Sequence, residues 1–333
     1  MTKTHKRQTR GMLPLISLLT LLVSLSSCNQ ANTNQTSSVE SSPQAQAASQ
    51  TSSKTKVVTT FLPIYLLTKA VAGDAADVEI LVPPGTEVHE YQATPDNVKA
   101  IATANILVKN GLGLEEFLEN TVKNAQNPQL VEIDASKGIK PLNEISPVET
   151  TTSGEKDHDH DHDHAEGNPH VWLDPVLAKQ QVMNIRDGLI AADAKNKDAY
   201  TANAATYIQE LDKLNSEFQQ ALQKKPNCTF ITFHDAYPYL AQRYNLKQVA
   251  VVEIPEDQLS PTDVQKVVNT VKKYKVKALF SEPGVDNKLL KSLSQDLKLQ
   301  LQTLDSLETG ETDPQYYFKA MKLNLQTLES ACQ

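Results

Sequence analysis

Cysteine and tryptophan are scarce in this chain of 333 residues, and no basic patch stands out. The chain has three cysteines and one tryptophan. It contains no Cys-x-x-Cys pair, which argues against a zinc site built on thiolates. The net charge of -8 comes from 40 acidic and 32 basic residues. This balance argues against nucleic acid as a partner, because phosphate binding requires clustered positive charge.

The N-terminus is typical of an export signal. A positively charged start precedes the apolar run from Met12 to Leu25, which is too short to span a bilayer. The run closes on Ser26-Ser27-Cys28, an ending similar to the lipobox of bacterial lipoproteins, whose cysteine is lipidated. We expect residues 1–28 to be a lipoprotein signal and Cys28 to anchor an exported, periplasmic or cell-surface protein. An ordinary cleaved signal or an uncleaved anchor is the alternative.

Beyond the signal, the composition divides the chain further. Residues 29–55 are mostly Ser, Gln, Thr, Ala and Asn, with too little apolar surface to fold, and predict a flexible tether. The remaining length exceeds one average domain and predicts two lobes. We expect an N-terminal lobe at 56–195, a linking helix at 196–224 and a C-terminal lobe at 225–333. Within the first lobe, 136–168 is predicted to be a mobile surface loop rich in His and Asp.

Short apolar strands alternate with helical segments in both lobes, which predicts an α/β fold with parallel sheets. Between them, apolar residues recur every three or four positions from about Asn196 to Lys224, as in a long rigid helix. The strands are expected near residues 56–61, 78–82, 106–108, 130–133, 229–232, 248–252, 278–280 and 299–304. In open parallel sheets, ligands bind beyond the carboxyl ends of strands. His89, His234 and Asp305 each follow such an end.

Histidine is concentrated in a few places. Four of the eight alternate with aspartate, at His158, His160, His162 and His164, and His89, His170 and His234 stand alone. Taken singly, each of these three could be a loop or core-edge histidine, and Asp305 could be a turn residue. Together, three imidazoles and one carboxylate form the usual ligand set of tetrahedral zinc. We therefore predict a metal site made by His89, His170, His234 and Asp305, in a cleft between the lobes.

The segments around these residues resemble a known family, the metal-binding lipoproteins of ABC importers for zinc and manganese (cluster A-I substrate-binding proteins). The resemblance runs from about Lys56 to the C-terminus. It rests on Pro-Gly-x-x-x-His-Glu-Tyr, Asn-Pro-His-Val-Trp-Leu-Asp-Pro, Phe-His-Asp-Ala-Tyr, Phe-Ser-Glu-Pro and Leu304-Asp305. It implies two α/β lobes joined by one long helix, the same four ligands, and a permease with its ATPase as partners. We expect the binding protein itself to be a monomer.

The resemblance also bears on which metal is bound. Manganese-type members place a carboxylate where this chain has His234, and nitrogen ligands favour zinc over manganese. We therefore expect Zn²⁺ as the transported ligand, with Mn²⁺ as the alternative. The Asp157–His164 tract resembles the insertion of the zinc branch and predicts weak, exchangeable auxiliary sites. A solvated loop without function is the simpler interpretation of this tract.

Other functions are compatible with the same residues. A zinc hydrolase could use three histidines with Glu90 or Glu282 as base, but no His-Glu-x-x-His helix is present, and a fourth protein ligand would leave no water position. We therefore do not expect an enzyme. A surface adhesin would need a protein partner that the sequence does not show. Glu282 could orient a ligand imidazole or simply face solvent. Cys228 and Cys332 could form a disulfide or stay reduced.

Overall fold

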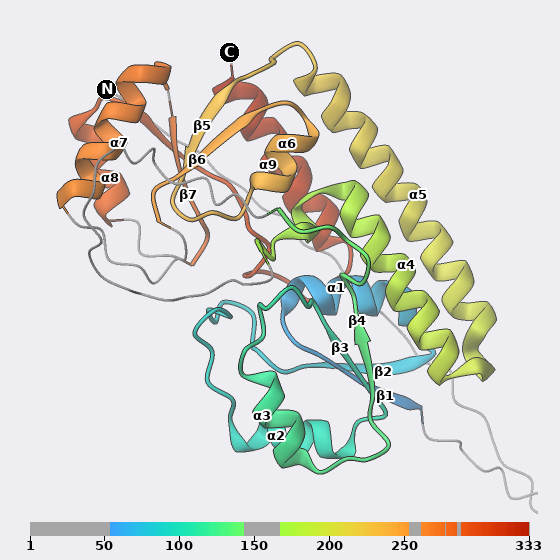
Figure 1. Cartoon of the computed structure of the whole chain (residues 1–333). Coiled ribbons are helices and arrows are strands. Elements are labelled where there is room, and N and C mark those ends of the chain that lie inside the picture. Colours follow the sequence, from blue (N-terminus) through green and yellow to red (C-terminus); the bar gives the residue numbers. More distant parts are fainter. Residues whose placement is uncertain (1–53, 143–166, 253–260, 277, 285–287, 333) are drawn as a thin grey trace, which may run out of the picture. The chain divides into compact units, whose positions relative to one another are not determined.

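In this computed structural model, the chain forms two four-stranded parallel sheets of the same strand order (Figure 1). The structure describes residues 54–142, 167–252, 261–276, 278–284 and 288–332. Both sheets lie in one compact unit, Ser52–Gln333. The expected signal, the tether as far as residue 53, Cys28 and the four tract histidines lie outside the described residues.

The N-terminal lobe is built on a sheet of order β2-β1-β3-β4. Its strands and helices are β1 Thr55–Thr59, α1 Leu62–Ala72, β2 Ala76–Ile80, α2 Pro95–Thr103, β3 Ile106–Lys109, α3 Leu118–Ala125 and β4 Val131–Asp134. Along β1, Val57 packs into a large central core and Val58 into a smaller cluster with α2 and α3. Both faces of the sheet are therefore covered, as expected for parallel strands.

The C-terminal lobe repeats the arrangement in the order β6-β5-β7-β8. Its elements are β5 Thr229–Thr232, α6 Pro238–Arg243, β6 Lys247–Ala250, α7 Pro261–Tyr274, β7 Ala278–Ser281, α8 Lys288–Asp296, β8 Gln300–Thr303 and α9 Tyr316–Ala331. Figure 1 shows α7 and α8 on one face of this sheet and α6 and α9 on the other. On β5, Phe230 faces the central core and Ile231 faces a separate cluster that includes Val267 of α7.

Two long helices connect the lobes. A 3-10 turn at Val171–Leu173 leads into α4, Pro175–Ala192, and a second at Ala194–Asn196 leads into α5, Lys197–Leu222. Helix α5 has 26 residues and is therefore about 39 Å long. It packs against α1 and α4 of the first lobe and α9 of the second. The predicted two-lobed fold with a long connecting helix is confirmed.

One apolar core runs through both lobes. Residues of α1, α4, α5, β5 and α9 belong to the same buried cluster, which includes Leu66, Trp172, Tyr207, Phe230 and Tyr317. Because the largest core is shared by the two lobes, moving the lobes apart would expose its apolar side chains, at a cost of about 25 cal/mol per Å². We therefore expect small loop movements, rather than a wide hinge, to accompany binding.

The segment expected to be a mobile surface loop, 136–168, is packed where the structure describes it. Ile139 is buried in a small cluster with Val171 and Tyr239. The Leu142 N–H donates to the Tyr239 hydroxyl at 3.0 Å, and the same hydroxyl donates to the Asn168 carbonyl at 2.5 Å. Leu142 and Asn168 are therefore both bonded to Tyr239 of α6, and the mobility expected of residues 136–168 stays a prediction.

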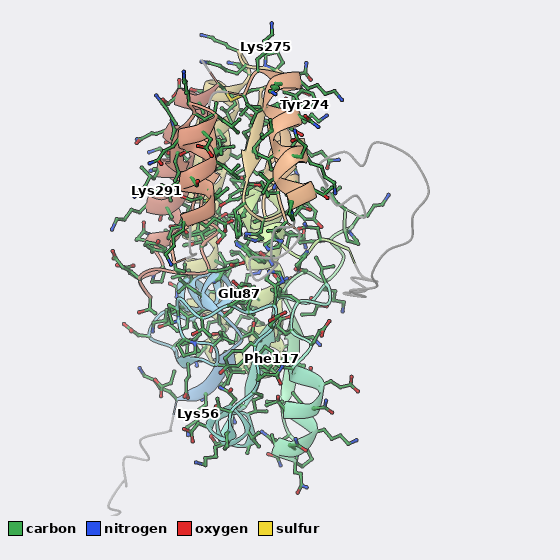
Figure 2. The ribbon with its side chains drawn as sticks, turned by 90° about the vertical axis from the view of Figure 1, so that its left-hand side faces the viewer. Lys56, Glu87, Phe117, Tyr274, Lys275 and Lys291 are labelled. Atoms are coloured by element: carbon green, nitrogen blue, oxygen red, sulfur yellow. A yellow bond between two sulfur atoms is a disulfide. The ribbon has the colours of Figure 1, made fainter. Side chains whose placement is uncertain are left out.

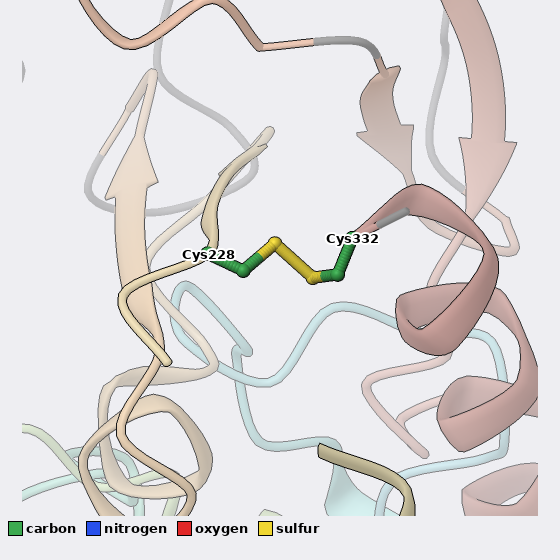
Figure 3. Close-up of a disulfide and its surroundings, with 2 residues drawn as sticks. All are labelled: Cys228 and Cys332. Atoms are coloured by element: carbon green, nitrogen blue, oxygen red, sulfur yellow. A yellow bond between two sulfur atoms is a disulfide. The ribbon is translucent and has the colours of Figure 1, made fainter. Parts of the chain in front are cut away.

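A disulfide joins Cys228, just before β5, to Cys332 at the end of α9 (Figure 3). The two cysteines are 104 positions apart and their Cα atoms are 5.7 Å apart, which is ordinary disulfide geometry. The sequence left this pairing open. The bond ties the C-terminal helix to the start of β5, the strand that leads to His234.

We expect loss of this disulfide to lower the free energy of unfolding by about 3–5 kcal/mol, because a loop of roughly 100 residues is closed in the unfolded chain. Unfolding in urea of a Cys228→Ser/Cys332→Ser double variant measures the change. Reduction of the unmodified protein is the matched control and should give the same shift. An unchanged midpoint in both would mean that the bond does not restrain the unfolded state.

Candidate metal centre

Three histidines and one glutamate, distant in the sequence, meet where the two lobes join. His89, His170, His234 and Glu308 each offer one ligand atom, and these atoms lie within 4.8 Å of one another. His234 and His170 are buried, with 0% and 2% of their surface exposed, and Glu308 is 8% exposed. His89 is partly exposed. The site therefore has three buried members and one member nearer to solvent.

Each member comes from a different segment. His89 lies in the long loop between β2 and α2, and His170 lies just before the 3-10 turn that leads into α4. His234 lies two residues beyond β5, and Glu308 follows β8. The two C-terminal-lobe members therefore lie beyond the carboxyl ends of parallel strands, where ligands of such sheets bind.

The distances fit a tetrahedral ion. Nε2 of His234 lies 3.2 Å from Nε2 of His170, and Nε2 of His170 lies 3.6 Å from Oε1 of Glu308. Ligand atoms 2.0–2.2 Å from a tetrahedral zinc ion would be about 3.3–3.6 Å apart. The spacing of His170 from His234 and from Glu308 is therefore close to what one such ion needs, and all four ligand atoms lie within 4.8 Å of one another.

Hydrogen bonds at Nδ1 point Nε2 of two of these rings into the site. Nδ1 of His234 donates to Oε1 of Glu282 at 2.5 Å, and Nδ1 of His170 donates to Oδ1 of Asn168 at 3.0 Å. Because an acceptor holds the Nδ1 proton, the neutral ring presents the Nε2 lone pair to a cation. Glu282 is 4% exposed, so it lies inside the protein and orients His234.

The segment that carries His170 is held from several sides. The Asn168 amide donates to the Asp235 carbonyl at 2.7 Å, and Asn110 donates to the Pro169 carbonyl at 3.1 Å. The indole of Trp172, fully buried, donates to the Ser306 carbonyl at 2.8 Å. These bonds join segments of both lobes around the site, so the position of His170 is set before any ligand arrives.

The charged groups of the site shift one another's pKa values. Burial lowers the pKa of the His234 imidazole, but the adjacent Glu282 carboxylate outweighs that effect and raises the pKa to about 9. Burial raises the pKa of Glu308 well above its ordinary value. The positive charge of His234 lowers this pKa, whereas the negative charges of Glu87 and Glu282 raise it further. In the metal-free protein at neutral pH, His234 is therefore positively charged, while burial favours the neutral acid form of Glu308.

Glu87 lies near the site, at the level where the two lobes meet (Figure 2). Its carboxylate accepts the Val88 and His89 N–H groups at 3.0 and 3.5 Å. Burial raises the pKa of Glu87, and the charge of His234 partly opposes that shift. Glu87 therefore shapes the loop that carries His89 and adds negative potential to the site.

The structure does not bring Asp305 into this group. Oδ1 of Asp305 accepts the Leu307 N–H at 2.7 Å and Oδ2 accepts the Tyr316 hydroxyl at 2.6 Å. One carboxylate oxygen is therefore engaged by the loop after β8 and the other by the first residue of α9, while Glu308, three residues on, reaches His170. Sequence reasoning missed Glu308. The sequence gives only a weak indication of Glu308, because it is simply a second carboxylate after the same strand, in Leu304-Asp305-Ser306-Leu307-Glu308.

The fold and the site define a two-lobed α/β protein with a candidate metal centre at the junction of its lobes. The family model described as "Zinc-uptake complex component A periplasmic" matches residues 57–331. The chain belongs to this family.

Individual relatives agree with this assignment. The high-affinity zinc uptake system protein ZnuA of Bacillus subtilis is 32% identical over 288 residues, covering 84% of this chain and 88% of its own. The zinc-binding lipoprotein AdcA of Streptococcus pneumoniae is 33% identical over 285 residues, covering 84% of this chain but only 56% of its own. The chain thus spans little more than half the length of AdcA.

A solved structure extends the similarity to three dimensions. The crystal structure of the Zn(II)-bound ZnuA-like domain of Streptococcus pneumoniae AdcA matches with a TM-score of 0.69 and 30% identity, covering 84% of this chain and 99% of that one. Among the described residues, no helix combines the length and the apolar character needed to cross a membrane.

Proposed function

We propose that this protein is an exported zinc receptor that binds Zn²⁺ at the lobe junction and delivers it to an ABC-type importer. The ligands are His89, His170, His234 and Glu308, with Glu308 in the role first expected of Asp305. The observation that carries the proposal is the preformed cluster itself, with ligand atoms 3.2 and 3.6 Å apart. The zinc-binding names of the relatives support the choice of metal.

Three nitrogens and one oxygen favour zinc over manganese, which prefers carboxylate and water ligands. Competition against a chromophoric chelator, with Zn²⁺ and Mn²⁺ in parallel, tests the proposal. We expect one tight equivalent of Zn²⁺ and binding of Mn²⁺ at least about a hundredfold weaker. Equal affinity for both ions, or tighter Mn²⁺, would assign the protein to manganese instead.

Binding by four protein groups also argues against a hydrolase. A catalytic zinc usually keeps three protein ligands and an open position for water, and here a carboxylate oxygen of Glu308 supplies a fourth ligand within reach of His170. The partners of such a receptor are a permease and its cytoplasmic ATPase. Lipidation at Cys28 would hold the receptor, a monomer, at the membrane surface.

The tract histidines His158, His160, His162 and His164 serve as auxiliary sites in this proposal. Four imidazoles among aspartates bind zinc weakly and raise its concentration near the main site. Deleting residues 157–164 should therefore leave the tight equivalent unchanged and remove only weaker equivalents, as counted by calorimetry. A matched deletion of residues 144–151, which contain no histidine, is the control. Loss of the tight equivalent would place the main site in the tract.

A further inference from the structure

The loop after β8 holds Glu308 through a set of bonds centred on Asp305. Oδ1 of Asp305 accepts the Leu307 N–H, closing a tight turn two residues ahead of its own position. Oδ2 accepts the Tyr316 hydroxyl at 2.6 Å, and Tyr316 begins α9. Asp305 is buried, 7% exposed. Both of its oxygens are therefore committed to the protein.

The backbone of Asp305 is held as firmly as its side chain. Its N–H donates to Oδ1 of Asn324, and the Asn324 amide donates back to the Asp305 carbonyl, both at 2.8 Å. Asn324 is 1% exposed in the middle of α9. Asp305, Tyr316 and Asn324, which we call the bracket, thus fasten the loop to the helix.

The turn closed by Asp305 sets the direction of Glu308. Leu307, between them in the loop and fully buried, has a φ of 69°. This left-handed conformation costs an ordinary residue roughly 1–2 kcal/mol and needs local support. The bond from the Leu307 N–H to Asp305 supplies that support. With Leu307 in this conformation, the chain turns so that the Glu308 side chain faces the histidines.

The same short loop contacts the other lobe. The Ser306 carbonyl accepts the Trp172 indole N–H at 2.8 Å, and the Glu308 carbonyl accepts the Gly85 N–H at 3.2 Å. Gly85 lies in the loop that also carries His89, and Trp172 follows His170 by two residues. The position of Asp305 therefore affects how Glu308 sits relative to both histidines of the first lobe.

We propose that Asp305 is a positioning residue, which holds the Glu308 carboxylate on the metal through the bracket and does not bind the metal itself. This inference rests on the proposed function, since it assumes that Glu308 is a ligand. Asp305 and Glu308 follow the same strand, but in this inference Glu308 binds the metal and Asp305 fixes the position of Glu308. Without the bracket, the site keeps three imidazoles and loses its fixed oxygen.

Four variants test the inference: Asp305→Ala, Asp305→Asn, Glu308→Ala and the double Asp305→Ala/Glu308→Ala. Zinc affinity is measured by chelator competition. We expect Glu308→Ala and Asp305→Ala to weaken binding by similar factors, roughly a hundredfold, and the double variant to be no weaker than Glu308→Ala within about threefold. Asparagine keeps the oxygen that accepts the Leu307 N–H, so Asp305→Asn should lose less than about tenfold.

Cobalt absorption supplies a readout that general loosening of the fold would not reproduce. Co²⁺ bound to Asp305→Ala should give the visible spectrum of the Glu308→Ala complex, and Asp305→Asn should give that of the unmodified protein. Asp296→Ala, which removes an exposed carboxylate of α8, is the control. If Asp305→Ala does not fold, Tyr316→Phe removes one arm of the bracket and should move the spectrum in the same direction.

The outcomes separate this inference from the proposed function. If Asp305→Asn loses as much affinity as Asp305→Ala while Glu308→Ala binds normally, Asp305 is the ligand and the inference is overturned. Losses that multiply in the double variant would overturn it as well. If the unmodified protein itself does not bind Zn²⁺ tightly, the proposed function fails, whatever the role of Asp305.

Discussion

Replacing His234 by alanine should weaken Zn²⁺ binding at least about a hundredfold. Zinc held by four protein ligands binds with roughly 10–16 kcal/mol, so one ligand contributes about 3 kcal/mol, which is about two orders of magnitude in Kd. His234 is fully buried, so the substitution removes a ligand from inside the protein and leaves a cavity in its place. We expect His170→Ala to lose a similar amount and the more exposed His89→Ala somewhat less.

Chelator competition with the purified variants measures these losses. His164→Ala removes an imidazole from the Asp/His tract and is the matched control, which should keep the tight equivalent. The midpoint of thermal unfolding without metal should change little for His89→Ala, since that side chain is not in the core. Unchanged affinity in both His89→Ala and His234→Ala would refute the ligand assignment.

Much of the fold follows from local patterns in the sequence. The apolar spacing from Tyr200 to Leu222 predicted a helix at 196–224, and α5 is Lys197–Leu222. The strand Thr229–Thr232 lies where its β-branched and aromatic residues predicted it. These elements can be predicted because their apolar residues face one core and therefore recur at regular intervals in the sequence.

Helix α9 was not predicted, although its buried residues do recur every three or four positions, at Tyr317, Met321, Asn324 and Leu328. A buried asparagine interrupts the apolar stripe, and it is there because its amide bonds the backbone of Asp305. The tertiary contact that explains this buried asparagine is not visible in a single sequence.

The same limitation explains why Asp305, and not Glu308, was expected to be the fourth ligand. The strand-end rule places both carboxylates in the right region, because both follow β8. Which of them faces the histidines depends on the left-handed turn at Leu307 and on Tyr316. The three histidines could be predicted because imidazole is rare in this chain, whereas carboxylates are common and only their geometry distinguishes them.

Zinc affinity should fall as the pH is lowered below about 9, by about tenfold for each pH unit near neutrality. The pKa of His234 is raised to about 9, so below that pH the metal-free protein holds a proton that zinc must displace. The raised pKa of Glu308 acts in the same direction. Each displaced proton costs a factor of ten per pH unit, because ligands bind metal only when deprotonated.

Calorimetry in buffers of different ionisation enthalpy counts these protons directly. At pH 7 we expect release of about one proton per zinc from His234, and between pH 8 and pH 6 a loss of affinity of about a hundredfold. Glu282→Gln is the informative variant, since its amide oxygen can still accept from Nδ1 of His234 but carries no charge. Without that charge, burial lowers the pKa of His234, so this variant should release nearly one proton fewer. An enthalpy independent of the buffer would mean that His234 and Glu308 are already deprotonated before zinc arrives.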